Sequence, residues 1–182
     1  MKTVFKKDDF NSNEGMLTSV WGPSMWHSLH TISFNYPVNP SKDDKKNYYN
    51  FFKSLQNILP CKYCRINYKK NIQKVPLNMR TMKNRYTVSK WLYDLHEEIN
   101  TMLCKKSNLT YEKVQNRYEN FRSRCLDKKE VPQKKTQKRK KESGCVVPLY
   151  GKKSKCVISI VPKDTKCKTF NIDKQCIVKA YN

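Results

Sequence analysis

Apolar positions in residues 16–125 recur at intervals of three and four, the period of an amphipathic helix. Pro23 is expected at the first position of the first helix, and Pro37 ends that helix. Ser41 and Asp44 resemble the capping box that begins a second helix. One apolar stripe runs along each helix, made by Met25, Leu29, Ile32 and Tyr36 in the first and by Tyr48, Phe51, Phe52, Leu55, Ile58 and Leu59 in the second.

The same pattern predicts three further helices. Pro60 ends the second helix and begins a third that runs through Ile72, which puts Cys61 and Cys64 in its first turn. A fourth helix is expected from about Arg80 to Leu103, and a short fifth follows a cap at Thr110. The fourth carries Val88, Trp91, Leu92, Leu95, Ile99 and Met102, and the fifth carries Val114, Tyr118 and Phe121. Because the connections are short and polar, the fold class expected for residues 16–125 is an all-α helical bundle.

Composition divides the rest of the chain. Residues 1–15 form an N-terminal extension, and residues 126–144 are rich in lysine and lack aromatic residues, which indicates a flexible basic linker. Residues 145–182 read as short strands and contain cysteines at intervals of eleven, eleven and nine, namely Cys145, Cys156, Cys167 and Cys176. We expect a small strand-containing unit. Its four cysteines form either a structural staple or a mobile electron shuttle, and the sequence does not choose their pairing.

The formal net charge of +23 comes mostly from lysine. Such a charge attracts polyanions, but a solvated lysine-rich surface has the same composition. We expect the charge to belong mainly to the solvated surface; whether nucleic acid is a partner stays open, and no sequence-specific binding is expected. No apolar run is long enough to span a membrane, and the first residues lack the apolar core of a secretory signal. The expected location is therefore intracellular and soluble.

Cys61 and Cys64 form a Cys-x-x-Cys motif in a chain with eight cysteines and no secretory signal, which favours metal or redox chemistry. A zinc site would need a second ligand pair, and the next cysteine, Cys104, is forty residues away. His27 and His30 could complete such a site, although not at a zinc-finger spacing. In a redox site, the helix N-terminus would stabilise a thiolate.

The all-helical pattern lacks the strand–helix–strand frame of thioredoxins. If the two cysteines are redox-active in a different fold, they need another electron acceptor, which must be a cofactor. Trp26 and His30 lie one helical turn apart, as do His96 and Asn100. Together with Lys105 and Tyr118, these residues could hold a planar heterocycle and its phosphates. The alternative is that the aromatic residues belong to the core and that the histidines are satisfied polar residues.

Five segments occur in this order along the chain: WGPSMWHSLH (21–30), YP (36–37), PCKYC (60–64), WLYDLHEEIN (91–100) and Tyr118. Together they resemble the Erv/ALR FAD-linked sulfhydryl oxidases, and the richness in lysine, asparagine and tyrosine resembles members from large cytoplasmic DNA viruses. The resemblance implies a four-helix bundle with a short fifth helix, bound FAD and a homodimer. It implies cofactor contacts from Gly22, Trp26, His30, Tyr63, Trp91, His96, Asn100, Lys105 and Tyr118, with no metal.

By the same resemblance, Cys61 is the interchange sulfur that a substrate dithiol attacks, and Cys64 is the sulfur beside the flavin. Electrons from protein dithiols would pass through this pair to FAD and then to dioxygen, giving hydrogen peroxide. A structural disulfide between Cys104 and Cys125 is also implied. Two features depart from the family: His96-Glu97 stands where His-Asn is usual, and the Cys-x-x-Cys shuttle pair that several members carry outside the core has no counterpart here.

The hypothesis is thus a thiol oxidase of viral type, in the host cytoplasm or the virion. The alternative from another class is a zinc-stabilised basic module that binds nucleic acid through its charge.

Overall fold

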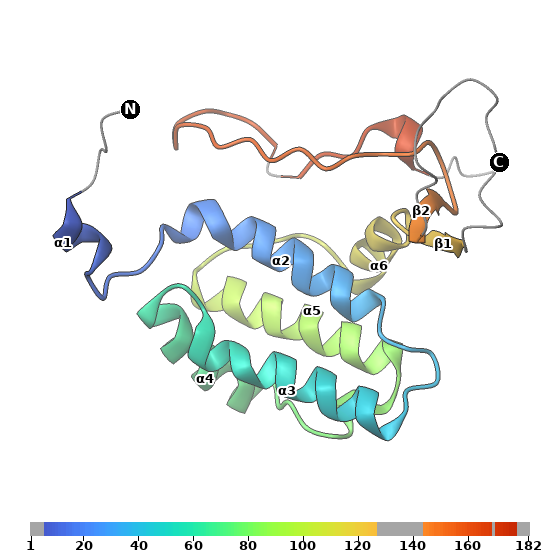
Figure 1. Ribbon diagram of the computed structural model, residues 1–182, viewed down its shortest axis with the longest axis horizontal. Coiled ribbons are helices and arrows are strands. Elements are labelled where there is room, and N and C mark those ends of the chain that lie inside the picture. Colours follow the sequence, from blue (N-terminus) through green and yellow to red (C-terminus); the bar gives the residue numbers. More distant parts are fainter. Residues whose placement is uncertain (1–5, 127–143, 169, 178–182) are drawn as a thin grey trace. The chain divides into compact units, whose positions relative to one another are not determined.

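The computed structural model describes residues 6–126, 144–168 and 170–177 (Figure 1). The chain divides into two compact units, Met1–Asn108 and Leu109–Asn182. The basic segment expected as a linker lies at residues 127–143, outside the described residues.

The first unit is built from helices (Figure 1). Helix α2 packs against α5, α3 packs against α4, and the short η1 lies against α3 and α5. The expected helical bundle is therefore confirmed. Its elements are α1 (Lys7–Phe10), α2 (Thr18–Phe34), α3 (Lys42–Ile58), α4 (Lys62–Lys74), η1 (Thr81–Lys83) and α5 (Arg85–Met102).

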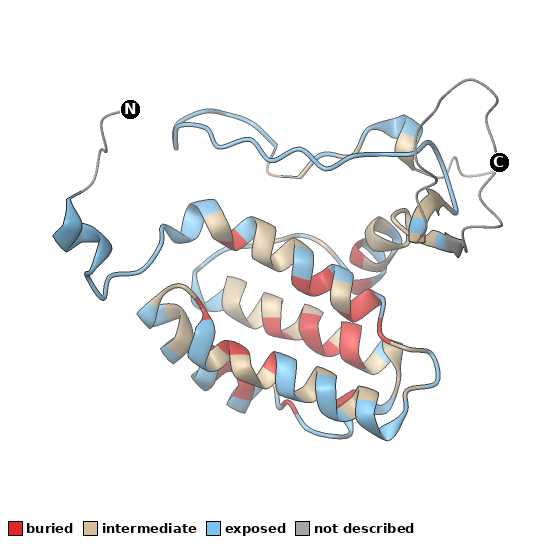
Figure 2. Ribbon diagram, in the orientation of Figure 1, coloured by how far each residue is buried: buried red, intermediate tan, exposed pale blue. Residues whose placement is uncertain are grey.

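One continuous apolar core joins these helices, and Figure 2 shows buried positions on the facing sides of α2, α3 and α5. Phe52, Val88, Leu92 and Leu95 are fully excluded from solvent. The predicted stripes supply these residues, as the helical period requires. Two predicted members of the α3 stripe do not belong to the core: Ile58 is 63% exposed and Phe51 is 37% exposed.

The expected start of the first helix at Pro23 is wrong, because α2 begins five residues earlier, at Thr18. Pro23 therefore lies beyond the first turn, where its missing N–H costs one intrahelical hydrogen bond. A side-chain hydrogen bond stabilises this extra turn: the Trp21 indole N–H donates to the Met16 carbonyl over 3.0 Å.

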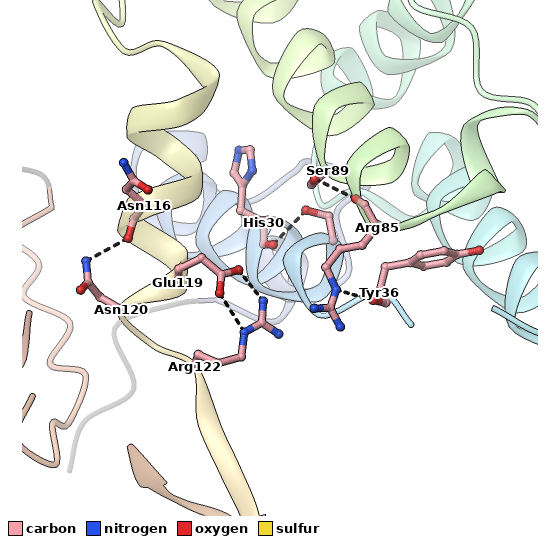
Figure 3. A network of polar contacts seen from close by, with 9 residues as sticks. His30, Tyr36, Arg85, Ser89, Asn116, Glu119, Asn120 and Arg122 are labelled. Atoms are coloured by element: carbon pink, nitrogen blue, oxygen red, sulfur yellow. Dashed lines mark hydrogen bonds and ion pairs between the residues drawn. The ribbon is translucent and has the colours of Figure 1, made fainter. Parts of the chain in front are cut away.

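The predicted caps at the other helix starts are confirmed. The Ser41 hydroxyl accepts from the Asp44 N–H over 3.0 Å, and the Thr110 hydroxyl accepts from the Lys113 N–H over 3.3 Å. Arg85, at the start of α5, donates through Nε to the Tyr36 carbonyl over 2.6 Å (Figure 3). This bond ties the segment after α2 to the beginning of α5.

The second unit contains α6 (Tyr111–Glu119), β1 (Ser123–Leu126), β2 (Gly144–Pro148) and the short η2 (Lys174–Cys176). The two strands pair antiparallel, with Cys125 opposite Cys145 and an irregular step between Arg124 and Cys125. Within this unit the Glu119 carboxylate pairs with Arg122 (Figure 3). The Arg117 guanidinium lies 4.9 Å from the Phe170 ring centroid, which joins α6 to the C-terminal segment.

Several short strands were expected in residues 145–182. Within the described residues of this tail, β2 is the only strand. Cys145 is disulfide-bonded, whereas Cys156, Cys167 and Cys176 carry free thiols. A staple of two disulfides among the four tail cysteines is therefore wrong. The reason is the ladder register, which pairs the segment of Cys145 with β1 and not with the rest of the tail.

The neighbouring phenylalanines of α3 give a matched test of the core. Phe52→Ala should lower the free energy of unfolding by about 3–5 kcal/mol, because it empties a fully buried site. Phe51→Ala should cost less than about 1 kcal/mol, because that ring is partly in solvent. Urea unfolding of both variants checks this, and equal losses would contradict the placement of the core.

Candidate active site

The Cys-x-x-Cys motif lies at the N-terminus of α4, where the sequence predicted it. Cys61 is the N-cap, and its sulfur accepts from the Cys64 N–H over 3.3 Å. The loop before it is held by Arg65, whose guanidinium donates to the Leu59 carbonyl over 2.6 Å. Both cysteines carry free thiols and are partly buried. The motif therefore has the helix-end geometry that stabilises a thiolate.

The two thiols differ in acidity. The pKa of Cys61 lies below the ordinary thiol value, chiefly because it accepts a hydrogen bond from the Cys64 side chain. The pKa of Cys64 lies above that value, chiefly because burial disfavours its thiolate. The outer sulfur is thus the more acidic of the pair, and the inner one is shielded.

A row of residues on α2 runs away from Cys64. Thr18, Gly22, Trp26 and His30 follow one another at intervals of four, so they lie along one side of the helix. The Thr18 hydroxyl lies 3.9 Å from the Cys64 sulfur. Gly22 is buried, yet a Cβ built there would meet only the Thr18 methyl, at 3.7 Å. The row therefore begins beside the Cys64 thiol, and its glycine would accept a methyl group in ordinary contact with Thr18.

The far part of this row meets α5 through His96. The Trp26 and His96 rings are stacked, with centroids 3.7 Å apart and planes 4° from parallel. His30 Nε2 lies 3.1 Å from His96 Nδ1, so one ring donates a hydrogen bond to the other. Burial lowers the pKa of His96 to about 4. His96 is therefore neutral near pH 7.

Glu97 holds the next turn of α5 in place. Its carboxylate accepts from the Asn100 amide over 3.0 Å and from the Ser107 hydroxyl over 2.9 Å. The Lys105 N–H donates to the Asn100 carbonyl over 2.8 Å, and the positive charge of Lys105 contributes to the low pKa of His96. The carboxylate at position 97 thus holds Asn100 and Ser107 together at the end of α5.

Other predicted site residues lie elsewhere. Trp91 is 5% exposed in the core, packs on Phe52 and donates its indole N–H to the Val75 carbonyl over 3.1 Å, so we assign it a structural role. Tyr63 is 73% exposed beside the cysteines and lines no buried site. Tyr118 belongs to the second unit, where burial raises its pKa to about 12.

The expected disulfide between Cys104 and Cys125 is not formed, because Cys104 carries a free thiol. Cys104 is exposed in the turn after α5, in a left-handed backbone conformation with φ of 55°. Cys125 lies in β1, opposite the disulfide-bonded Cys145. The pairing of β1 with β2 thus replaces the expected link to the end of α5.

The sequence left a zinc site open, with His27 and His30 as further ligands. Across residues 6–126, 144–168 and 170–177, no three His, Cys, Asp or Glu side chains gather in a way that could hold a metal ion. His30 faces His96 instead. The arrangement gives no support to a zinc-stabilised module.

Two functional residues were missed by the sequence analysis. Thr18 lies before the quoted motif, and its signal was the four-residue spacing to Gly22 and Trp26. Glu97 was noted only as a departure, and nothing in the sequence indicated that Asn100 and Ser107 are its partners.

The site thus combines a helical bundle, a helix-capping Cys-x-x-Cys and an aromatic–histidine cluster. The profile of the Erv1/Alr family matches residues 23–119, more than half of the chain. The chain therefore belongs to the Erv1/Alr family.

Relatives in this family include viral and cellular proteins. The "Probable FAD-linked sulfhydryl oxidase R368" of Acanthamoeba polyphaga mimivirus is 41% identical over 91 residues, which are 50% of this chain and 63% of that protein. The "Putative FAD-linked sulfhydryl oxidase 347L" of Invertebrate iridescent virus 6 is 31% identical over 47% of this chain and 81% of its own length. The yeast mitochondrial protein ERV1 is 27% identical, and the match covers 43% of its length.

The structure of the yeast Erv1 core superposes with a TM-score of 0.51 and 21% identity, over 64% of this chain and 92% of that one. At this identity the match shows a shared fold. The chain spans less than two thirds of the mimivirus and yeast relatives, so their activities are not transferred by similarity alone. None of the helices in the described residues is long and apolar enough to cross a membrane.

The unequal thiol acidities predict unequal reactivity. In the reduced protein at about pH 8, iodoacetamide should modify Cys61 well before Cys64, because the thiolate is the nucleophile and Cys61 holds more of it. Mass spectrometry of peptides after short reaction times measures the order. The Cys61→Ser variant is the control for Cys64 alone. Earlier labelling of Cys64 would contradict the assignment.

The low pKa of His96 makes stability depend on pH. The unfolded chain binds a proton to this residue below about pH 6.5, whereas the folded protein resists protonation until about pH 4. The contribution of His96 to stability is therefore present above pH 6.5 and is lost as the pH falls towards 4. Urea midpoints measured across this window should fall more steeply for wild type than for His96→Gln. Parallel curves would show that His96 is not the buried neutral group.

Proposed function

We propose that this chain is an FAD-linked sulfhydryl oxidase that forms disulfides in protein substrates. A substrate dithiol gives up two electrons and two protons and becomes a disulfide, while the Cys61–Cys64 disulfide becomes two thiols. Dioxygen is the final acceptor and is reduced to hydrogen peroxide. Bound FAD supplies the two-electron chemistry that connects the thiols with dioxygen.

The observation that carries the proposal is the row on α2. It starts at Thr18, in contact with the inner thiol Cys64, and ends at His30 in the histidine pair with His96. A redox-active thiol and a flat, neutral, hydrogen-bonding ring cluster are thereby placed along one helix side. The alternative is that these side chains only pack in the core; the row supports a site instead because it links the Cys64 thiol to the histidine pair along one helix face.

The residues present fit a flavin. Gly22 leaves room beside Thr18, where a planar ring could approach the Cys64 sulfur. Trp26 and His96 offer aromatic faces, and the His30–His96 pair offers ring nitrogens as hydrogen-bonding groups. Lys105 offers a positive charge for phosphate. The residues that would hold FAD are thus Gly22, Trp26, His30, His96, Asn100 and Lys105, with Tyr118 proposed from the family resemblance.

Cys61 and Cys64 have different roles in the thiol–disulfide exchange. Cys61, at the exposed helix end, is attacked by a substrate thiolate, and its bond to Cys64 breaks. Its low pKa makes Cys61 the sulfur that leaves readily when the substrate's second thiol displaces it. Cys64 is shielded from solvent and from competing thiols, so it is held for the redox step. Thr18 Oγ1 is placed to hydrogen-bond the Cys64 sulfur as charge develops there.

The proposal also covers the bounds of the domain, its substrates, its assembly and its location. Residues 16–125 are proposed as the oxidase domain, with protein dithiols and dioxygen as its substrates and a homodimer as its assembly. The viral relatives support work in the host cytoplasm or the virion. The free thiols of Cys156 and Cys167 retain the chemistry needed for the proposed shuttle role of the tail.

The visible absorption spectrum of purified protein tests the proposal. Wild type should show a flavin spectrum and consume dioxygen with dithiothreitol. Cys64→Ser should keep the flavin but lose oxidase activity by at least about a hundredfold, because no internal disulfide can form. Cys104→Ser, which changes an exposed free thiol, should retain both properties.

A colourless wild-type protein that FAD does not bind would overturn the proposal. Full activity in Cys64→Ser would show that the oxidation takes place elsewhere. Stoichiometric zinc in a colourless protein would favour the basic nucleic-acid module instead.

A further inference from the structure

The charges of the first unit are unevenly distributed along its sequence. Residues 45–93 contain twelve Lys or Arg residues and no Asp or Glu, and we call them the acid-free stretch. The rest of the described first unit, residues 6–44 and 94–108, contains five basic and eight acidic residues. The positive charge of this part of the chain therefore comes entirely from the acid-free stretch.

The acid-free stretch also forms one side of the bundle. It contains most of α3 and all of α4 and η1; α3 packs against α4, and η1 lies against α3. Figure 1 shows α5 between α2 and the pair formed by α3 and α4, which we call the α3–α4 layer. Helix α2 has no Lys, Arg, Asp or Glu. A ligand attracted by the charge would therefore bind the α3–α4 layer, away from the residues of α2 proposed to hold the flavin.

The exposed face of α4 carries a row of lysines. Lys62, Lys69 and Lys70 are exposed, on the side of the helix away from its buried residues Tyr68 and Ile72. Lys62 and Lys69 are seven residues apart, which is about two turns, so they lie nearly in line along the helix. Helix α4 contains no carboxylate that would repel an anion along this row. The row therefore fits a ligand with several negative charges in sequence.

Exposed tyrosines accompany the basic residues of the acid-free stretch. Tyr63 follows Lys62 and is 73% exposed, and Tyr86 follows Arg85 and is 59% exposed. Lysines that bind phosphates, interleaved with aromatic rings on which bases stack, are the combination that binds single-stranded nucleic acid. An acidic polypeptide would use the lysines alone. The tyrosines therefore favour nucleic acid among the polyanions.

We propose that the α3–α4 layer binds single-stranded nucleic acid without sequence preference. Lys62, Lys69 and Lys70 bind its phosphates, and a base stacks on Tyr63. The ammonium groups act as point charges that displace counterions from the strand, so binding weakens steeply as the salt concentration rises. This site is separate from the thiol chemistry and does not depend on the oxidase function.

The test is fluorescence anisotropy of a labelled thymidine strand of about 20 nucleotides with the full chain and its flavin, at several salt concentrations. The triple variant Lys62→Gln, Lys69→Gln, Lys70→Gln should bind at least about tenfold more weakly near 0.1 M salt. The slope of log K against log salt should become shallower by about 2, because three phosphate contacts of about 0.7 each are lost. Tyr63→Leu should weaken binding at least about fivefold and leave the slope unchanged, because it removes stacking but no charge.

A matched control separates this site from the overall charge. The triple variant Lys6→Gln, Lys7→Gln, Lys42→Gln removes the same three charges from exposed positions of the same unit, outside the acid-free stretch. It should keep the affinity within about twofold of wild type and the same salt slope. Because all the lysines changed in both variants are exposed, urea unfolding should show wild-type stability within about 0.5 kcal/mol.

Three results would overturn the proposal. Equal weakening by the two triple variants would mean that only the net charge acts. Equal competition by polyglutamate or by phosphatidylserine vesicles, with no effect of Tyr63→Leu, would assign the layer to an acidic polypeptide or a membrane surface. A wild type that does not bind the strand near 0.1 M salt would remove the site altogether. None of these results bears on the oxidase function, which flavin absorption and dithiothreitol oxidation measure separately.

Discussion

The stack of Trp26 on His96 is the contact on which the site depends, because it joins α2 to α5 at the point where their chemistry meets. It brings His30 within 3.1 Å of His96. Burial in this contact keeps His96 neutral, so the cluster offers hydrogen bonds without a buried charge. Glu97 fixes the following turn, and the thiols lie at the other end of the α2 row. A bundle without this contact would still fold around its apolar core but would lack an ordered cluster.

The electrostatics of the two cysteines follow from position rather than from the overall charge of +23. Cys61 accepts a backbone N–H at the start of α4, while Cys64 lies one turn inside, against the core. Exposed lysines spread over the surface are screened by salt and act weakly at this range. The difference in acidity thus comes chiefly from the hydrogen bond that Cys61 accepts from the Cys64 side chain and from the burial of Cys64.

Much of the bundle could be predicted because helical period and capping are local signals. Ser41 and Thr110 cap as expected, and Cys61 and Cys64 lie at the helix start that Pro60 indicated. The start of α2 could not be predicted, because it depends on a bond from Trp21 to Met16 rather than on Pro23. Trp91 could not be separated from Trp26 by type or spacing; only packing shows that one is core and the other faces His96. Cys104 carries a free thiol while Cys125 lies in a strand opposite Cys145, and a pairing between such distant segments leaves no local signal in the sequence.

The central proposal is that a flavin binds along the row from Thr18 to His30, against Gly22. The most direct measurement is the flavin content of Gly22→Ala and Gly22→Leu, each purified with excess FAD. A methyl group meets only the Thr18 methyl at 3.7 Å, so the alanine variant should keep most of its flavin. The leucine variant should remain helical by circular dichroism but bind FAD at least about tenfold more weakly, since its larger side chain would clash with a ring bound against Gly22. Unchanged flavin binding by a folded Gly22→Leu protein would contradict the account.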